Sequence, residues 1–132
     1  MKVVDYFTGG LTCSLNVLDI QKAMKWYQEV LGFELIYYLE DLGWCELKSP
    51  IFGVNVGLSQ VEKMPVPGGN AVLTWGVMDI VQARGELENR DVRFDGDIRT
   101  IEDMVKLATF YDPDGNSYML YQDISLPKGK AK

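Results

Sequence analysis

The sequence contains no histidine. Histidine is the usual general base near neutral pH, the commonest metal ligand, and the partner of the nucleophile in Ser-His and Cys-His sites. Its absence excludes most hydrolase mechanisms and removes the ligand on which many metal centres depend. We therefore expect no catalytic residue of these kinds, no metal ligand and no cofactor.

Cysteine is scarce as well, with only Cys13 and Cys45. Two cysteines cannot form a four-cysteine zinc site, and their spacing matches neither a Cys-x-x-Cys pair nor a disulfide framework. The N-terminus lacks the charged and then apolar pattern of a secretory signal, and no run of eighteen apolar residues is present. These absences predict free thiols in a cytoplasmic protein that has no membrane partner.

Basic residues are in the minority, with 13 Lys and Arg against 19 Asp and Glu and a formal net charge of -6. A negative protein repels phosphate backbones and attracts cations, so we expect no nucleic acid partner. The length of 132 residues and the hydrophobic fraction of 47% are those of one compact domain.

The first half of the chain reads as a strand, a helix and three further strands. Residues 11–17 alternate, with Leu11 on the side predicted to pack inside. Asp19 is a candidate helix N-cap, and Gly32 supplies a left-handed stop to the helix. Strands are predicted at 33–39, 44–48 and 54–58.

The same order begins again after residues 61–70, which are rich in Pro and Gly and predict a linker. An offset of 60 superposes Asp19 on Asp79, and an offset of 62 to 63 superposes the later turns. We predict an α+β fold in which two repeated strand-helix-strand-strand-strand modules form curved mixed sheets around a cleft. The modules are 11–60 and 71–123, followed by a basic tail at 124–132.

Three runs resemble the vicinal oxygen chelate superfamily, which includes glyoxalase I, extradiol dioxygenases and bleomycin-resistance proteins. They are Leu-Asn-Val-Leu-Asp at 15–19, Trp-Tyr-Gln-Glu-Val-Leu-Gly-Phe at 26–33 and Tyr-Asp-Pro-Asp-Gly-Asn at 111–116. The resemblance covers roughly residues 11–122 and implies the paired-module fold and a homodimer. It implies no single activity, because one fold carries many functions.

The resemblance also implies where a metal would sit in those members that use one. The corresponding positions of this sequence are Thr12, Val72, Met119 and Gly57, or Val56 instead of Gly57 if the repeat is aligned through Pro50. None supplies the imidazole or carboxylate that a divalent metal needs. We expect Glu46 and Glu102 to be solvated charges, although either could bind an ion elsewhere.

Strand parity instead predicts a neutral pocket for a small organic molecule. Its expected ligand-binding residues are Thr12, Ser14, Asn16, Trp44, Asn55, Thr74, Met119 and Tyr121. The place of Asn55 depends on the register of its strand, since a slip of one residue would turn Val54, Val56 and Leu58 inward instead. The leading hypothesis is a metal-free protein of the glyoxalase/bleomycin-resistance type that sequesters a cationic or aromatic drug or metabolite. The alternatives are a glyoxalase-like lyase, isomerase or thiol transferase with an atypical site, and a structural or regulatory domain that acts through its dimer interface.

Overall fold

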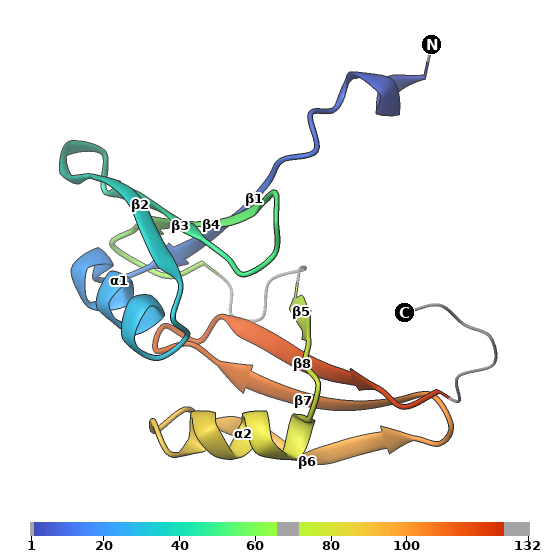
Figure 1. Ribbon diagram of the computed structural model, residues 1–132. Coiled ribbons are helices and arrows are strands. Elements are labelled where there is room, and N and C mark those ends of the chain that lie inside the picture. The colour runs from blue at the N-terminus through green and yellow to red at the C-terminus, as the bar shows by residue number, and fades with distance from the viewer. Residues whose placement is uncertain (1, 66–71, 126–132) are drawn as a thin grey trace. The chain divides into compact units, whose positions relative to one another are not determined.

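The computed structural model describes residues 2–65 and 72–125, and its internal contacts divide the chain into two units, 1–66 and 67–132 (Figure 1). The predicted linker residues 66–70 and most of the predicted tail, 126–132, lie outside the described residues. Each unit is an α+β module with one four-stranded mixed sheet and one α-helix. The predicted fold class and the internal repeat are therefore confirmed.

The first unit follows the predicted order closely. Its elements are η1 (Val3–Tyr6), β1 (Leu11–Val17), α1 (Ile20–Glu29), β2 (Glu34–Leu39), η2 (Glu40–Leu42), β3 (Trp44–Lys48) and β4 (Val54–Gln60). The sheet order is β1-β4-β3-β2, with β1 parallel to β4 and the other pairs antiparallel. Among this unit's described residues, the sequence pattern predicted neither of the two 3-10 elements, η1 and η2.

The second unit repeats this arrangement. Its elements are β5 (Leu73–Gly76), α2 (Ile80–Glu88), β6 (Phe94–Ile101), β7 (Val105–Tyr111) and β8 (Ser117–Asp123). The sheet order is β5-β8-β7-β6, and β5 runs parallel to β8 as β1 does to β4. In both sheets the first strand in the chain is an edge strand. Exposed edges of this kind were one reason to expect a homodimer, which stays a prediction.

Both α-helices begin at the aspartate that the sequence predicted. Asp19 accepts a hydrogen bond from the Lys22 amide at 3.1 Å, and Asp79 accepts one from the Gln82 amide at the same distance. A second hydrogen bond at the start of each helix is repeated in the two units. The side-chain oxygen of Gln60 accepts from the Ile20 amide, and that of Gln122 accepts from the Ile80 amide at 2.8 Å. Each glutamine therefore ties the last strand of its sheet to the start of its helix.

Replacing Gln122 with Ala is expected to lower the free energy of unfolding by about 1–2 kcal/mol, because the Ile80 amide loses its acceptor. Ile80 is fully buried, so water replaces the lost contact poorly. Gln82→Ala, at an exposed position on α2, is the matched control and is expected to change stability by less than about 0.5 kcal/mol. Urea unfolding of the two variants measures the difference, and equal midpoints would contradict the assignment.

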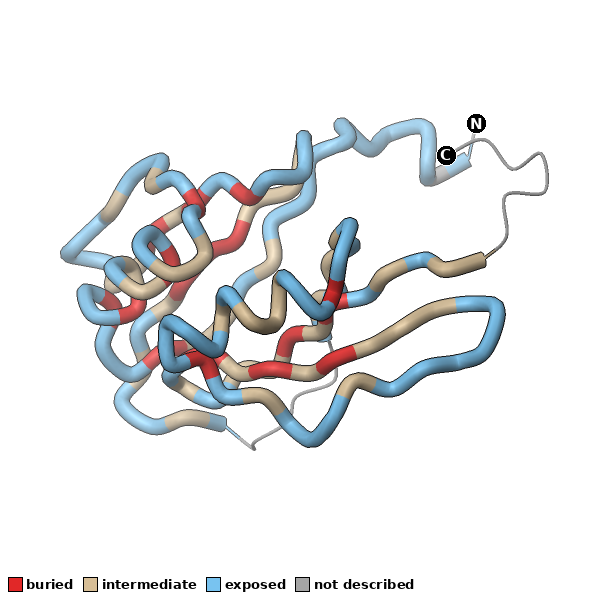
Figure 2. The backbone as a smooth tube through the Cα atoms, turned by 60° about the horizontal axis from the view of Figure 1, so that its bottom comes forward, coloured by how far each residue is buried: buried red, intermediate tan, exposed pale blue. Residues whose placement is uncertain are grey.

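Each helix covers one face of its own sheet, and the buried residues lie between them (Figure 2). In the first unit these include Val17 on β1, Cys45 and Leu47 on β3, and Val56 and Leu58 on β4. Burial increases along β1 towards Val17, where the chain enters α1, and Leu11 at the other end is 59% exposed. The expectation that Leu11 packs inside is wrong, because α1 packs mainly against β4, β2 and β3 and leaves this end of β1 exposed.

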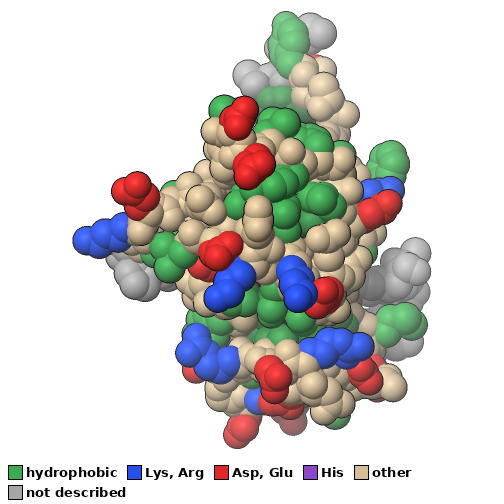
Figure 3. All heavy atoms as spheres, turned by 90° about the vertical axis from the view of Figure 1, so that its left-hand side faces the viewer, with side chains coloured by type: hydrophobic (Ala, Val, Ile, Leu, Met, Phe, Trp, Pro, Cys, Tyr) green, Lys and Arg blue, Asp and Glu red, His purple; other side chains and the backbone are tan. Residues whose placement is uncertain are grey.

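Charged residues of both signs are interspersed on the face shown in Figure 3 rather than segregated into separate areas. The described residues contain two ion pairs, Arg84–Glu88 and Arg90–Glu86. Each joins residues four positions apart, in α2 or just after its C-terminal end. Within the described ranges, no helix is long and apolar enough to cross a membrane.

Candidate functional site

The open face of the first sheet is the face opposite α1, and polar side chains from all of its strands lie on it. Because side chains alternate along a strand, the residues between the buried ones point to this face. Those on the open face are Thr12, Ser14, Asn16, Glu34, Tyr37, Leu39, Trp44, Glu46, Lys48, Asn55, Gly57 and Ser59. They come from all four strands of the sheet.

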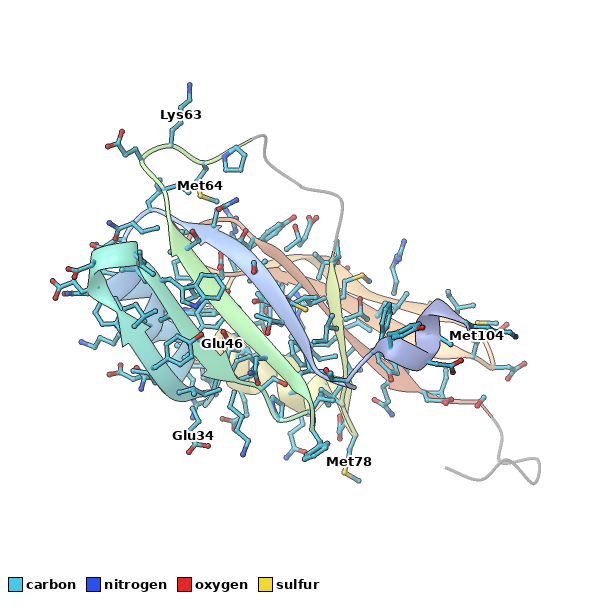
Figure 4. The ribbon with its side chains drawn as sticks, turned by 90° about the horizontal axis from the view of Figure 1, so that it is seen from above. Glu34, Glu46, Lys63, Met64, Met78 and Met104 are labelled. Carbon is cyan, nitrogen blue, oxygen red and sulfur yellow. The ribbon has the colours of Figure 1, made fainter. Side chains whose placement is uncertain are left out.

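Glu46 lies at the centre of this open face and is half-buried (Figure 4). Its Oε2 accepts hydrogen bonds from the Thr12 hydroxyl at 2.9 Å and the Asn55 amide at 3.0 Å. Its Oε1 accepts one from the Tyr37 hydroxyl at 3.0 Å. The expectation that Glu46 is a solvated charge is therefore wrong, whereas Glu102 is exposed as expected.

All three hydrogen-bond donors to Glu46 are neutral side chains. Among the described residues, the Glu46 carboxylate forms no ion pair. Partial burial raises the pKa of Glu46, but the hydrogen bonds from Asn55, Thr12 and Tyr37 together lower it by more. The pKa of Glu46 thus lies below its ordinary value, and the group is an anion at neutral pH. A fixed negative charge faces the open side of the sheet.

Trp44 lies beside this carboxylate and covers Gly57. Its six-membered ring occupies the space that a Cβ on Gly57 would take, so only glycine permits this packing. The indole Nε1–H donates to the Tyr37 hydroxyl at 3.3 Å, and that hydroxyl donates in turn to Glu46. Trp44, Tyr37 and Glu46 form one hydrogen-bonded chain that fixes an aromatic ring next to an anion.

The predicted residues of the first unit share this face. Thr12 and Asn55 meet on Glu46, Ser14 lies opposite Gly57 in the ladder, and Asn16 lies opposite Ser59. The register of β4 was the uncertain point in the sequence, and burial of Val56 and Leu58 places Asn55 on the open face. The ligand-binding role of these residues remains a prediction.

The second unit carries the other predicted residues on the face of its sheet opposite the helix-packed core. Met119 pairs with Thr74 on one side and Thr109 on the other, and it lines a hollow with Asp95, Asp97 and Arg99 among others. The Thr74 hydroxyl donates to the Val72 carbonyl at 3.3 Å, so it is engaged locally. Tyr121 lies against Gly76, with its ring 2.9 Å from the position of a Cβ there. Each sheet therefore has an aromatic ring seated on a glycine.

Two groups with raised pKa values lie outside the Glu46 cluster. Burial, and to a smaller extent the charge of Glu46, raises the pKa of Cys45 to about 11 against the opposing effect of a hydrogen bond with the Leu58 backbone. This thiol is protonated at neutral pH and is a poor nucleophile. A hydrogen bond to Asp95 raises the pKa of Tyr111, and partial desolvation and the Asp95 charge add to it, while Arg93, stacked over the ring, lowers it.

The four positions at which metal-dependent relatives would hold a metal do not fit one here. The structure selects Gly57 over Val56 as the fourth position, since Gly57 faces Ser14 as Met119 faces Thr74. The Thr12 hydroxyl donates to Glu46, and the Trp44 ring covers Gly57. Val72 and Met119 offer a hydrocarbon and a thioether. Among the described residues no three His, Cys, Asp or Glu side chains lie close enough to hold an ion.

Sequence reasoning missed Glu46 and Tyr37. Glu46 could have been found, because it lies two residues from Trp44 on one strand and must share its face. Tyr37 could be predicted only as an aromatic residue on a strand, because its place beside Glu46 depends on a bulge in β2 between Leu35 and Tyr37. An unbroken ladder would pair Ile36 with Glu46, and the bulge brings Tyr37 to that position instead.

The chain belongs to the glyoxalase/bleomycin resistance protein/dioxygenase superfamily, whose family model matches residues 9–120. A superfamily member from Sphaerobacter thermophilus DSM 20745 has a similar structure, with a TM-score of 0.75, 25% identity and coverage of 89% of this chain and 98% of that one. TnmS3, an antibiotic binding protein from Streptomyces sp. CB03234, has a TM-score of 0.73, 26% identity and coverage of 89% and 98%.

A glyoxalase/bleomycin resistance protein from the same Streptomyces strain has a TM-score of 0.65 and 27% identity, and covers 84% of this chain and 97% of its own. The comparison with curated protein sequences gives no match. These likenesses define the superfamily and the fold, and the residues on the open face must supply the argument for function.

Proposed function

We propose that this chain is a metal-free protein that binds a small organic molecule on the open face of its first sheet. The observation that carries the proposal is the Trp44 ring seated on Gly57, at a position where metal-dependent relatives would place a ligand. An aromatic ring that lies on a sheet presents its other face to a flat ligand. Hydrogen-bonding groups around it, from Thr12 to Asn55, supply orientation.

Two further observations support a cationic or aromatic drug or metabolite as the ligand. The net charge of -6 attracts cations, and the anion of Glu46 lies next to the aromatic ring. TnmS3, with 26% identity over most of both chains, is described as an antibiotic binding protein. Binding of this kind sequesters a molecule and requires no reaction at the site.

The experiment is a titration with a set of flat aromatic compounds in the presence of EDTA, followed by ligand-observed NMR and by the indole N–H signals of the protein. We expect compounds that bind to shift the Trp44 signal and to keep their affinity in EDTA. Trp44→Leu is expected to weaken their binding about tenfold or more, the effect of losing roughly 1.4 kcal/mol of ring contact.

Trp26→Leu is the matched control, because it makes the same change on α1, where Trp26 packs edge-on against Tyr27. We expect it to leave the affinities within about twofold. Equal losses in both variants, or no compound that shifts the Trp44 signal, would overturn the proposal. If the affinity disappears in EDTA, binding depends on a metal, and a metal-dependent function of the kind found in the superfamily explains the site better.

A further inference from the structure

One hydrogen-bond acceptor position of Glu46 is unused, and it determines which kind of organic cation the open face of the first sheet can bind. This inference rests on the proposed function. A carboxylate has about four acceptor positions, two on each oxygen. Oε2 uses both of its positions, for the Thr12 hydroxyl and the Asn55 amide. Oε1 uses one, for the Tyr37 hydroxyl. One acceptor position on Oε1 remains for a ligand.

This count separates two classes of organic cation. A guanidinium or amidinium binds a carboxylate best as a fork, with one N–H to each oxygen. Oε2 has no free position for the second N–H, so a forked cation can make only half of its contacts here. An ammonium is a point charge that needs a single acceptor, and its other hydrogens remain in solvent.

The position of Trp44 fixes the distance between the charge and a ring on the same ligand. Trp44 and Glu46 leave the same face of β3, and the Trp44 ring leans over Gly57, the residue directly opposite Glu46 in the ladder, where Cα atoms lie about 5 Å apart. Tyr37 contacts both through one hydroxyl, which holds the spacing. A ring on Trp44 and a cation on Glu46 therefore belong to one molecule with a linker of one or two methylenes.

No basic residue in the described strands of this sheet forms an ion pair with Glu46. Lys48 lies two residues further along β3 on the same face, but it is exposed and no ion pair joins it to Glu46. The carboxylate is ionised at neutral pH, because its three hydrogen bonds outweigh the effect of its partial burial. The negative charge is thus left for a ligand.

We infer that the open face of the first sheet selects an arylalkylammonium, a flat ring that lies on Trp44 and carries an ammonium that donates to Oε1 of Glu46. Neutral molecules with the same ring bind more weakly, and forked cations gain less than ammonium ions do. The selection comes from the hydrogen bonds that already occupy Oε2 rather than from the overall charge of the protein.

The test compares three probes that share one ring: 2-(2-naphthyl)ethylammonium, 2-(2-naphthyl)ethanol and 2-(2-naphthyl)ethylguanidinium. We expect the ammonium to bind about tenfold more tightly than the alcohol, the effect of one charge-assisted hydrogen bond. The guanidinium is expected to bind more weakly than the ammonium. Calorimetric titration at pH 7 gives the three affinities.

Glu46→Gln is expected to bring the ammonium and the alcohol to within about twofold of each other. Glu29→Gln is the matched control, since it removes one negative charge from an exposed position on α1, which covers the other face of this sheet. It is expected to keep the tenfold preference. If both variants lose the preference equally, the overall charge is responsible and the inference is wrong.

Thr12→Val tests the acceptor count without removing the charge. Valine has a similar shape to threonine but no hydroxyl, so Oε2 gains a free acceptor position. We expect the guanidinium to gain about fivefold relative to the ammonium. An unchanged ratio in this variant contradicts the inference even if Glu46→Gln fails to fold.

The outcomes also separate this inference from the proposed function. If all three probes bind with equal affinity and shift the Trp44 signal, the selection for ammonium is wrong and the proposed function stands. If none of them binds and flat aromatic compounds in general leave the Trp44 signal unmoved, the proposed function fails as well.

Discussion

Gly57→Ala is expected to drive the Trp44 ring off the first sheet and to weaken the binding of flat aromatic probes about tenfold. The added Cβ would overlap the far end of the indole, which must then swing away and break its hydrogen bond to Tyr37. Gly57 is buried, so the repacking is expected to cost about 1–3 kcal/mol of stability as well. The Trp44 indole N–H signal reports the displacement directly.

Gly85→Ala provides a control of opposite sign. A Cβ at Gly85 meets nothing within 4 Å, and the residue lies inside α2. Alanine there is expected to raise the free energy of unfolding by about 0.5–1 kcal/mol, because it restricts the unfolded chain and favours the helix. Gly57→Ala that retains both the Trp44 signal and the probe affinities would show that the ring is not held by the glycine.

The fold could be predicted because its signals are local. Asp19 and Asp79 each precede an apolar helical pattern, and Gly32 ends the first helix with a φ of +76°. A repeat of these signals predicts a repeat of the fold, since each module uses the same capping and turn chemistry. The glutamine contacts at the helix starts were not predicted, because they join residues about 40 positions apart.

The candidate site could be predicted only in part, for a related reason. Alternation along one strand predicts that Thr12, Ser14 and Asn16 share a face. For Asn55 the prediction depends on the register of its strand. The cluster on Glu46 depends on the pairing register of four strands, and a single bulge in β2 decides that Tyr37 belongs to it. A sequence shows which side chains share a face of a strand, and cross-strand hydrogen bonds require the ladder itself.

Asp112→Ala is expected to lower the free energy of unfolding by about 3 kcal/mol or more, the largest stability effect that we expect. Asp112 is only 3% exposed and closes the turn between β7 and β8. Its Oδ1 accepts from the amides of Asp114 at 2.9 Å and Asn116 at 2.8 Å, and its Oδ2 accepts from the Asn116 side-chain amide. Alanine leaves these donors without their acceptor in a half-buried turn.

A graded series of variants separates this effect from a general loss of charge. Asp112→Asn keeps the shape but retains one acceptor oxygen, so it is expected to lose about half as much stability as Asp112→Ala. Asp97→Ala removes the same charge from an exposed position on β6 and is expected to stay within about 0.5 kcal/mol of the original protein. Urea unfolding gives the order. If Asp112→Ala behaves like Asp97→Ala, the backbone hydrogen bonds of the turn suffice to hold it, and the buried carboxylate contributes nothing to its stability.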